Sequence, residues 1–313
     1  MGIWGETTRA RGSGANPGKS RTHTAKVQAL LRDWRQYSSY YSKLPPPRWE
    51  LSRPLVVRQL LRGSPRHSNR ELRSTSNGTT GKKRFANAEL VLFGKLKRFG
   101  YSPAVVYDIG ASDGCWSTST LPVFNGAAFH LFEPLGFSLP EYHEPLKHSL
   151  NAHPEFRLHQ IALSSRTGKE DLFVFCDVRG STLLDVPPGY YLENKVEVES
   201  WRLDDFVAAH HLRPPNVIKI DVQGFELEIL KGGAETVSKA DILVLETWLY
   251  RRYGPQMPVL GEIISFLSPL GFRLTDFGDN FVAERHILAS VDAFFMNTRF
   301  LDQFKSASRG WDW

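Results

Sequence analysis

The stretch VVYDIGASDG, residues 105–114, decides the expected fold. Its first five residues are typical of a short buried strand, and the glycines after them predict a turn into a helix from about Cys115. Glycine lets the backbone approach a ligand closely, because a side chain there would collide with it. Asp108 stands near the carboxyl end of the strand, where open α/β sheets bind their ligands. The stretch therefore predicts a strand, a turn and a helix, and it favours a nucleotide-type site.

Strands and helices alternate along the rest of the chain. The predicted core strands are 105–109, 128–132, 156–163, 217–221 and 241–246, and two more strands, 272–277 and 293–296, close the chain. Helical patterns cover 90–99, 139–152, 203–211, 225–230 and 260–270, and further β segments fall at 172–175 and 196–199. Nearly continuous apolar strands between helices predict an α/β domain, with a mostly parallel sheet and helices on both faces.

The first quarter of the chain differs in composition from the rest. Residues 1–84 hold 18 Lys and Arg against four acids, a net charge of +14, whereas residues 85–313 carry −8. Residues 1–22 and 63–84 have the composition of disordered segments, with one or two helices between them. We therefore predict a basic extension over 1–84 and a folded domain over 85–313. The extension either contacts an anionic partner or is simply a solvated leader.

A second acid, Glu133, ends the second predicted strand, 25 residues after Asp108. An acid at this position can accept hydrogen bonds from the ribose hydroxyls of a nucleoside. The alternative is that Glu133 only caps the end of its strand.

The glycine turn indicates which nucleoside to expect. Dinucleotide sites carry G-x-G-x-x-G, but here Ser112 replaces the middle glycine, and Asp113 adds negative charge where a pyrophosphate would lie. S-adenosylmethionine has no phosphate and carries a sulfonium and an ammonium group, which acidic neighbours favour. We therefore predict S-adenosylmethionine as the cofactor. The expected cofactor-binding residues are Asp108, Gly110, Ser112, Gly114 and Glu133.

The most specific stretch of the sequence is IKIDVQGFELEILKG, residues 218–232, and the segments 108–114, 132–134, 161–164, 181–184 and 203–206 accompany it. In these segments and their order, the sequence resembles the FkbM-type S-adenosylmethionine-dependent methyltransferases over about residues 85–300. The resemblance implies an enzyme with a Rossmann-like class I methyltransferase sheet. It also implies that the enzyme methylates a hydroxyl on a sugar, a glycan or a secondary metabolite. One position departs from the family, which usually reads Asp-Val-Glu-Gly, because Gln223 replaces that glutamate.

A hydroxyl acceptor must lose its proton as it attacks the methyl carbon, and Asp221 is the predicted base. It ends the fourth core strand, at the same edge of a parallel sheet as Asp108 and Glu133. The alternative role for Asp221 is to cap the helix that begins near Gly224. The aromatic and arginine residues of 247–253 either contact a polar acceptor or form a packed loop, and Trp116 either contacts the cofactor or packs in the core. His130 and His159 are expected to be structural, and Cys115 to be a small buried residue.

Two other functions stay open from the sequence: a nicotinamide-dependent oxidoreductase or epimerase, and a non-catalytic nucleic-acid-binding protein that uses the basic extension. No cluster of Cys and His residues suggests zinc, and no metal site is predicted. No apolar run approaches the roughly 20 residues that cross a bilayer, and the first residues lack the pattern of a signal peptide or a myristoylation site. We therefore expect a cytoplasmic enzyme with a small-molecule or glycan acceptor and no stable membrane insertion.

Overall fold

The structure is a computed structural model that describes residues 87–138, 140–175, 178–186, 195–282 and 288–307. The chain divides into two units, Met1–Ser76 and Asn77–Trp313, and every described residue lies in the second unit. The predicted boundary between residues 84 and 85 therefore lies outside the described residues. So do the predicted helices of the extension and its proposed contact with an anionic partner.

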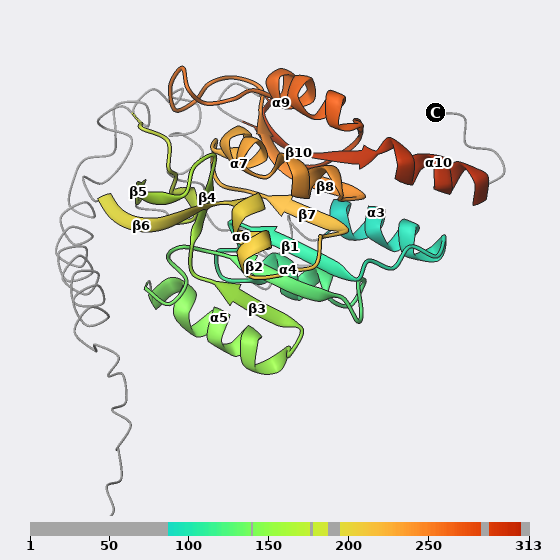
Figure 1. Ribbon diagram of the computed structural model, residues 1–313, viewed down its shortest axis with the longest axis horizontal. Coiled ribbons are helices and arrows are strands. Elements are labelled where there is room, and N and C mark those ends of the chain that lie inside the picture. Colours follow the sequence, from blue (N-terminus) through green and yellow to red (C-terminus); the bar gives the residue numbers. More distant parts are fainter. Residues whose placement is uncertain (1–86, 139, 176–177, 187–194, 283–287, 308–313) are drawn as a thin grey trace, which may run out of the picture. The chain divides into compact units, whose positions relative to one another are not determined.

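A seven-stranded sheet forms the centre of the described domain, with the strand order β3-β2-β1-β7-β8-β10-β9 (Figure 1). The first five strands in this order pair in parallel, and β10 pairs antiparallel with both β8 and β9. The strand bounds are β1 Val105–Ile109, β2 Ala128–Phe132, β3 Phe156–His159, β7 Val217–Ile220, β8 Ile242–Trp248, β9 Phe272–Val282 and β10 Leu288–Asn297. The expected mostly parallel sheet is confirmed.

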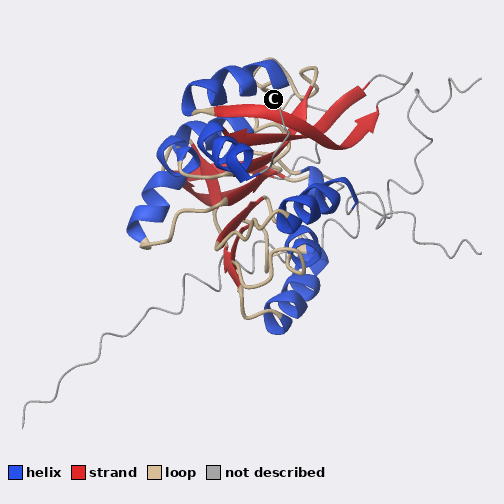
Figure 2. Cartoon of the chain, turned by 90° about the vertical axis from the view of Figure 1, so that its right-hand side faces the viewer, coloured by secondary structure: helices blue, strands red, loops and turns tan. Residues whose placement is uncertain are grey.

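Helices cover both faces of this sheet (Figure 2). On one face, α6 (Leu203–Ala209), α7 (Glu226–Gly232), α8 (Ala234–Ser238) and α9 (Leu260–Leu267) pack on an apolar core. Alternate residues of the strands supply that core, among them Tyr107, Ile218, Ile220, Leu243, Leu245 and Phe295. Because side chains alternate along a strand, the residues between these point to the opposite face.

The opposite face is covered by α3 (Asn87–Arg98), α4 (Cys115–Thr120) and α5 (Pro140–Ala152). Phe93 of α3 packs against Phe124 and Phe294, with ring centroids 4.6 and 6.1 Å apart. Polar side chains of β1, β7, β8 and β10 also lie on this face, beneath the helices. The chain continues from β10 into α10 (Thr298–Ala307).

The predicted strand over 156–163 is wrong in one respect, because it is two strands in different sheets. Main-sheet pairing ends where Phe132 faces His159, and β4 (Ala162–Ser164) then pairs with β6 (Lys195–Arg202). Together with β5 (Gly168–Phe173), these form a separate sheet in the order β4-β6-β5. The predicted β segments at 172–175 and 196–199 thus belong to a real insertion, to the left of the main sheet in Figure 1.

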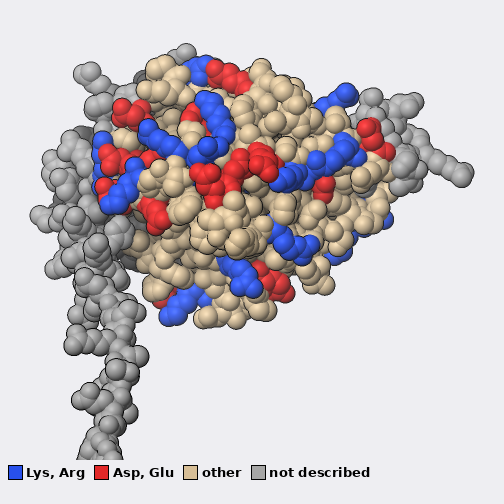
Figure 3. Space-filling model, viewed as in Figure 1, with Lys and Arg blue, Asp and Glu red and all other residues tan. Residues whose placement is uncertain are grey.

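The predicted helices are confirmed in type and roughly in extent. The predicted helix over 260–270 is α9 followed by a short 3-10 turn, η3 (Ser268–Leu270). None of the helices in the described ranges has both the length and the apolar composition that crossing a membrane requires. Basic and acidic side chains are interspersed over the face of the domain that Figure 3 shows.

Candidate functional site

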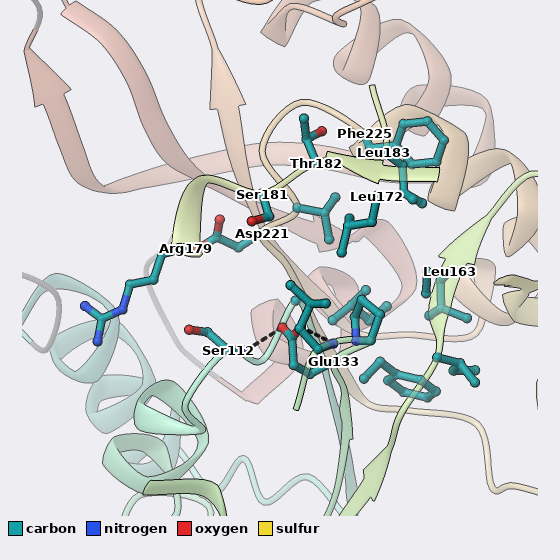
Figure 4. A pocket seen from close by; sticks show the side chains of 18 of the residues that line it. Ser112, Glu133, Leu163, Leu172, Arg179, Ser181, Thr182, Leu183, Asp221 and Phe225 are labelled. Carbon is teal, nitrogen blue, oxygen red and sulfur yellow. Dashed lines mark hydrogen bonds between the residues drawn. The ribbon is translucent and has the colours of Figure 1, made fainter. Parts of the chain in front are cut away.

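An open pocket lies at the carboxyl ends of β1, β2 and β7, and the space inside it, open solvent included, is about 590 Å³. In Figure 4, Leu163 lies toward one end, and Ser112, Ser181 and Asp221 lie toward the other. The apolar lining also includes Ile109, Phe132, Pro134, Leu135, Ile161, Ala162, Leu172, Leu183 and Phe225. The pocket therefore suits a ligand with a flat apolar ring at one end and polar groups at the other.

The glycine turn brings backbone, rather than side chains, to the pocket. Gly110 lines the cavity with a φ of 78°, in the left-handed region that glycine adopts most easily. Its N–H donates to the Phe132 carbonyl at 2.9 Å, which ties the turn to the end of β2. Gly114 also has a positive φ and precedes α4, but it lies against Leu146 and does not line the cavity.

Ser112 is a lining residue with an unusual backbone and an unused side chain. Its φ is 54°, which is rare for a residue other than glycine. Its Oγ is buried and has no hydrogen-bond partner within the described part of the chain. A buried hydroxyl without a partner is costly unless a ligand or water completes it. Ser112 therefore fits the role of a contact for a polar group of a bound ligand.

Glu133 lies at the middle of the pocket wall and is 7% exposed. Its two carboxylate oxygens accept hydrogen bonds from the backbone N–H groups of Ser112 and Leu135, both at 2.9 Å (Figure 4). Burial raises the pKa of Glu133 to about 7, although both backbone donors act in the opposite direction. Glu133 therefore caps the end of its strand, which was the alternative role given to it from the sequence. Each of its oxygens keeps a further lone pair for a hydroxyl donor.

Asp108 is fully buried and does not line the cavity. Its Oδ2 accepts a hydrogen bond from Ser117 Oγ at 2.7 Å, and its Oδ1 lies 3.9 Å from Lys219 Nζ. Burial raises the pKa of Asp108, while Lys219 and Ser117 favour its charged form. Asp108 and Gly114 therefore lie behind the pocket wall, so their influence on a ligand would pass through the turn and Lys219.

Asp221 follows β7 and lines the pocket, and its side chain is 34% exposed. Its Oδ2 lies 3.2 Å from Lys219 Nζ, and its Oδ1 accepts a hydrogen bond from Gln223 Nε2 at 3.0 Å. Burial alone lowers the pKa of Lys219, but Asp221, Asp108 and Glu89 together raise it above its usual value. Lys219 is therefore a buried cation that interacts with several carboxylates. Its position in an apolar strand did not predict this role.

The alternative role for Asp221, as the cap of the following helix, is wrong. The N-cap of α7 is Phe225, and Glu226 ties down the turn before it. Glu226 Oε1 accepts hydrogen bonds from the backbone N–H groups of Val222 and Gly224 at 3.3 and 3.0 Å. Glu226 is therefore structural, and burial raises its pKa to about 7.

Arg179 connects the inserted segment to the glycine turn. It belongs to a short 3-10 turn, η2 (Val178–Gly180), and it lines the pocket together with Ser181 and Thr182. Arg179 Nη2 lies 2.8 Å from Asp113 Oδ2. Asp113 would therefore repel a pyrophosphate less strongly than its place in the sequence suggests, because its charge is paired. The replacement of the middle glycine by Ser112 still departs from a dinucleotide turn.

Several other predicted residues have structural positions. His130 and His159 stack on neighbouring strands, with Nδ1 of His130 2.9 Å from Nε2 of His159, and burial lowers the pKa of each to about 4. Trp116 donates to Glu89 of α3 and packs edge-on to Phe93, so it is not a pocket residue. Cys115 is exposed, contrary to the expectation that it is buried.

The segment 247–253 is buried at both ends and exposed over residues 249–252, so it is neither wholly a packed loop nor wholly a contact surface. Trp248 and Tyr253 are 3% and 6% exposed and belong to an apolar cluster with Met257. Arg251 pairs with Glu262 at 2.7 Å. Within the described residues, no group of three or more His, Cys, Asp or Glu side chains has an arrangement that could hold a metal ion.

Known proteins match the part of the chain that builds this pocket. The model of the methyltransferase FkbM domain matches residues 108–274. The 2-O-methyltransferase NoeI of Sinorhizobium fredii (strain NBRC 101917 / NGR234) is 27% identical over 170 residues, which cover 50% of this chain and 68% of NoeI.

Two solved structures are more distant in sequence. Methyltransferase FkbM from Methylobacillus flagellatus KT is 19% identical with a TM-score of 0.39, over 61% of this chain and 43% of that one. The present chain thus matches less than half the length of that protein. Magnesium protoporphyrin IX methyltransferase from Synechocystis PCC 6803, solved with bound SAM, is 13% identical with a TM-score of 0.38, over 66% of this chain and 76% of that one.

Proposed function

The chain belongs to the methyltransferase FkbM domain family, and from this premise we propose that it transfers a methyl group from S-adenosylmethionine to a hydroxyl oxygen. The family model matches just over half of the chain, from the end of β1 into β9. The expected acceptor is a small molecule or a glycan, with the hydroxyl on a sugar or a secondary metabolite.

The observation that carries the proposal is the pairing of Glu133 with Ser112 in the wall of the pocket. Glu133 keeps lone pairs for the ribose hydroxyls, and the Ser112 hydroxyl lacks a partner within the described residues. The apolar lining around Ile161 and Leu163 suits an adenine ring. These residues fit S-adenosylmethionine, which supplies a methyl group bonded to a positively charged sulfur.

Asp221 is the proposed base. It lines the same pocket, and Lys219 and Gln223 hold its two oxygens in place. As the acceptor oxygen bonds to the methyl carbon, the bond from that carbon to sulfur breaks and Asp221 takes the hydroxyl proton. Holding the oxygen, carbon and sulfur in line is the larger part of the catalysis, since this displacement needs no covalent intermediate with the enzyme.

Oxygen as the target atom is supported by the relative NoeI, whose name describes a 2-O-methyltransferase. A carboxylate base also suits a hydroxyl, whose proton must leave as the new bond forms.

A labelled-methyl assay tests the proposal. The full chain is incubated with S-adenosylmethionine labelled in its methyl group and with fractionated cell extract, and mass spectrometry identifies the labelled product. We expect label in a methyl ether that survives mild base, and none with Asp221→Asn. Label on nitrogen or on a carboxyl group would contradict the proposed acceptor. Absence of binding of S-adenosylmethionine to the folded protein would contradict the proposed cofactor.

A further inference from the structure

Three carboxylates stand side by side at the edge of the sheet where the pocket opens. Ile220 of β7 pairs with Leu245 of β8, so the next residues, Asp221 and Glu246, are neighbours. Glu246 in turn lies directly opposite Asp292 of β10. Like charges at facing positions on adjacent strands destabilise a sheet. Something in this row must therefore offset the repulsion between the carboxylates.

Burial adds to the free-energy cost of ionising these carboxyl groups. It raises the pKa values of Glu246 and Asp292 well above the ordinary range, and nearby carboxylates add to the shift. Glu89 of α3, which is 4% exposed, adds a further acid whose pKa burial raises to about 7. Lys219 is the cation that the described residues bring to this group, and it lies closest to Asp221.

The gap between Asp221 and Glu246 is filled by a neutral group. Gln223 Nε2 lies 3.0 Å from Asp221 Oδ1 and 2.7 Å from Glu246 Oε2. A side-chain amide carries two hydrogens on one nitrogen and no charge, so it can donate to both carboxylates at once. A carboxylate in its place would be a third like charge, and a carboxylic acid has one hydrogen for two acceptors.

The backbone around Gln223 is set to hold this bridge. Gln223 has a φ of 57°, a strained value for a residue other than glycine, and such strain persists only where the surroundings enforce it. Glu226 enforces it here by accepting the N–H groups on either side of Gln223, those of Val222 and Gly224. The amide is therefore presented by a fixed turn rather than by a free loop.

Gln223 does not line the pocket, whereas Asp221 does. We infer that Gln223 is a positioning residue for methyl transfer: its amide bridges Asp221 to Glu246, so that Asp221, held on its other oxygen by Lys219, faces the acceptor in one orientation. The inference rests on the proposed function, because it takes Asp221 as the group beside the reacting atoms. Glu246, anchored by Ser290 Oγ at 3.3 Å, is the fixed end of the bridge.

Calorimetry on the full chain tests the bridge without an acceptor. S-adenosylmethionine carries a methyl group and a positive charge on its sulfur that S-adenosylhomocysteine lacks. The difference between the two compounds in protons released on binding therefore reports on the groups beside the sulfur. Gln223→Glu places a third carboxyl group between Asp221 and Glu246. We expect the three groups to share a bound proton, which leaves when the positively charged sulfonium binds beside them. Titrations in buffers of different ionisation enthalpy count the protons released. Gln256→Glu, at an exposed position outside the pocket lining, is the matched control for added charge.

We expect Gln223→Glu to release about half a proton or more with S-adenosylmethionine, relative to S-adenosylhomocysteine, beyond the difference that the wild type and the control show. An unchanged difference in this variant would overturn the inference. If instead the wild type binds neither compound, the proposed function itself is contradicted, and not only the role of Gln223.

A second variant covers the case in which Gln223→Glu does not fold. Gln223→Met keeps the length of the side chain and removes both donors. We expect its kcat for methyl transfer to fall about 10- to 100-fold while the KM for S-adenosylmethionine stays within twofold, because only the orientation of Asp221 is lost. A wild-type kcat in Gln223→Met would overturn the inference, since the bridge would then do nothing for Asp221.

Discussion

Gly110 lies so close to Asp221 that a Cβ on Gly110 would stand 2.0 Å from the Asp221 carbonyl oxygen. The N–H of Asp221 also donates to the carbonyl of Ile109 at 3.0 Å. The turn that carries the nucleoside contacts and the turn that carries the proposed base are therefore in direct backbone contact. A change in one must move the other.

Gly110→Ala is therefore expected to be severe. It combines a strained positive φ with a clash against backbone, and we expect a loss of about 2–4 kcal/mol in the free energy of unfolding. Urea denaturation measures the loss. Gly126→Ala is the control, because Gly126 also has a positive φ, 89°, but no atom within 4 Å of its added Cβ. Equal losses in the two variants would show that the contact with Asp221 carries no energy.

Asp221→Asn is expected to lower the rate of methyl transfer about 10²- to 10⁴-fold, the usual contribution of a general base. The amide keeps the size of the side chain, so the affinity for S-adenosylhomocysteine should stay within about threefold. Initial rates and calorimetry give the two numbers. Asp171→Asn breaks only an exposed ion pair with Lys195 and should leave both unchanged. A variant Asp221→Asn with wild-type rates would assign the proton to another group.

Binding of S-adenosylhomocysteine should depend on the ionisation of Glu133. Its pKa of about 7 reflects burial, and ribose hydroxyls donate to the charged form. At pH 6 the free protein holds Glu133 mostly protonated, so affinity should rise about tenfold between pH 6 and pH 8 and then level off. Glu133→Gln cannot ionise and should give weaker binding with a flat profile. A profile that rises equally in the variant would assign the titration elsewhere.

The ion pair between Arg179 and Asp113 should slow the escape of a bound nucleoside. It joins the inserted segment to the glycine turn, but the Arg179 side chain is 66% exposed, so its effect is modest. We expect Arg179→Gln to speed dissociation of S-adenosylhomocysteine two- to fivefold in stopped-flow experiments, with less dependence on salt than the wild type. Lys169→Gln breaks an ion pair with Glu197 in which both side chains are exposed and lie outside the pocket lining, and it should have no effect.

Much of the fold could be predicted from the sequence because its signals are local. The apolar run at 105–109, its glycines and the alternation of strands and helices each depend on neighbouring residues. The break between β3 and β4 could not be predicted, because the run over 156–163 stays β-like while the chain changes its partner from β2 to β6. Hydropathy indicates that a strand is buried but not which strand it pairs with.

The site was partly predictable for the same reason. Gly110, Ser112, Glu133 and Asp221 follow strands of a parallel sheet, so their convergence on one edge follows from the fold class. The partners of Asp221 depend on pairing between distant segments. Glu246 reaches Gln223 only because β8 lies beside β7. Arg179 pairs with Asp113 across 66 residues, and no local pattern indicates that contact.

Calorimetric titration of the full chain with S-adenosylhomocysteine tests most directly that the pocket beside Glu133 holds the methyl donor. We predict saturable binding of one molecule per chain near pH 8, and a loss of at least tenfold in affinity for Glu133→Ala, which removes the acceptor for the ribose hydroxyls. The absence of binding to folded wild-type protein, or equal affinity in Glu133→Ala, would contradict this assignment.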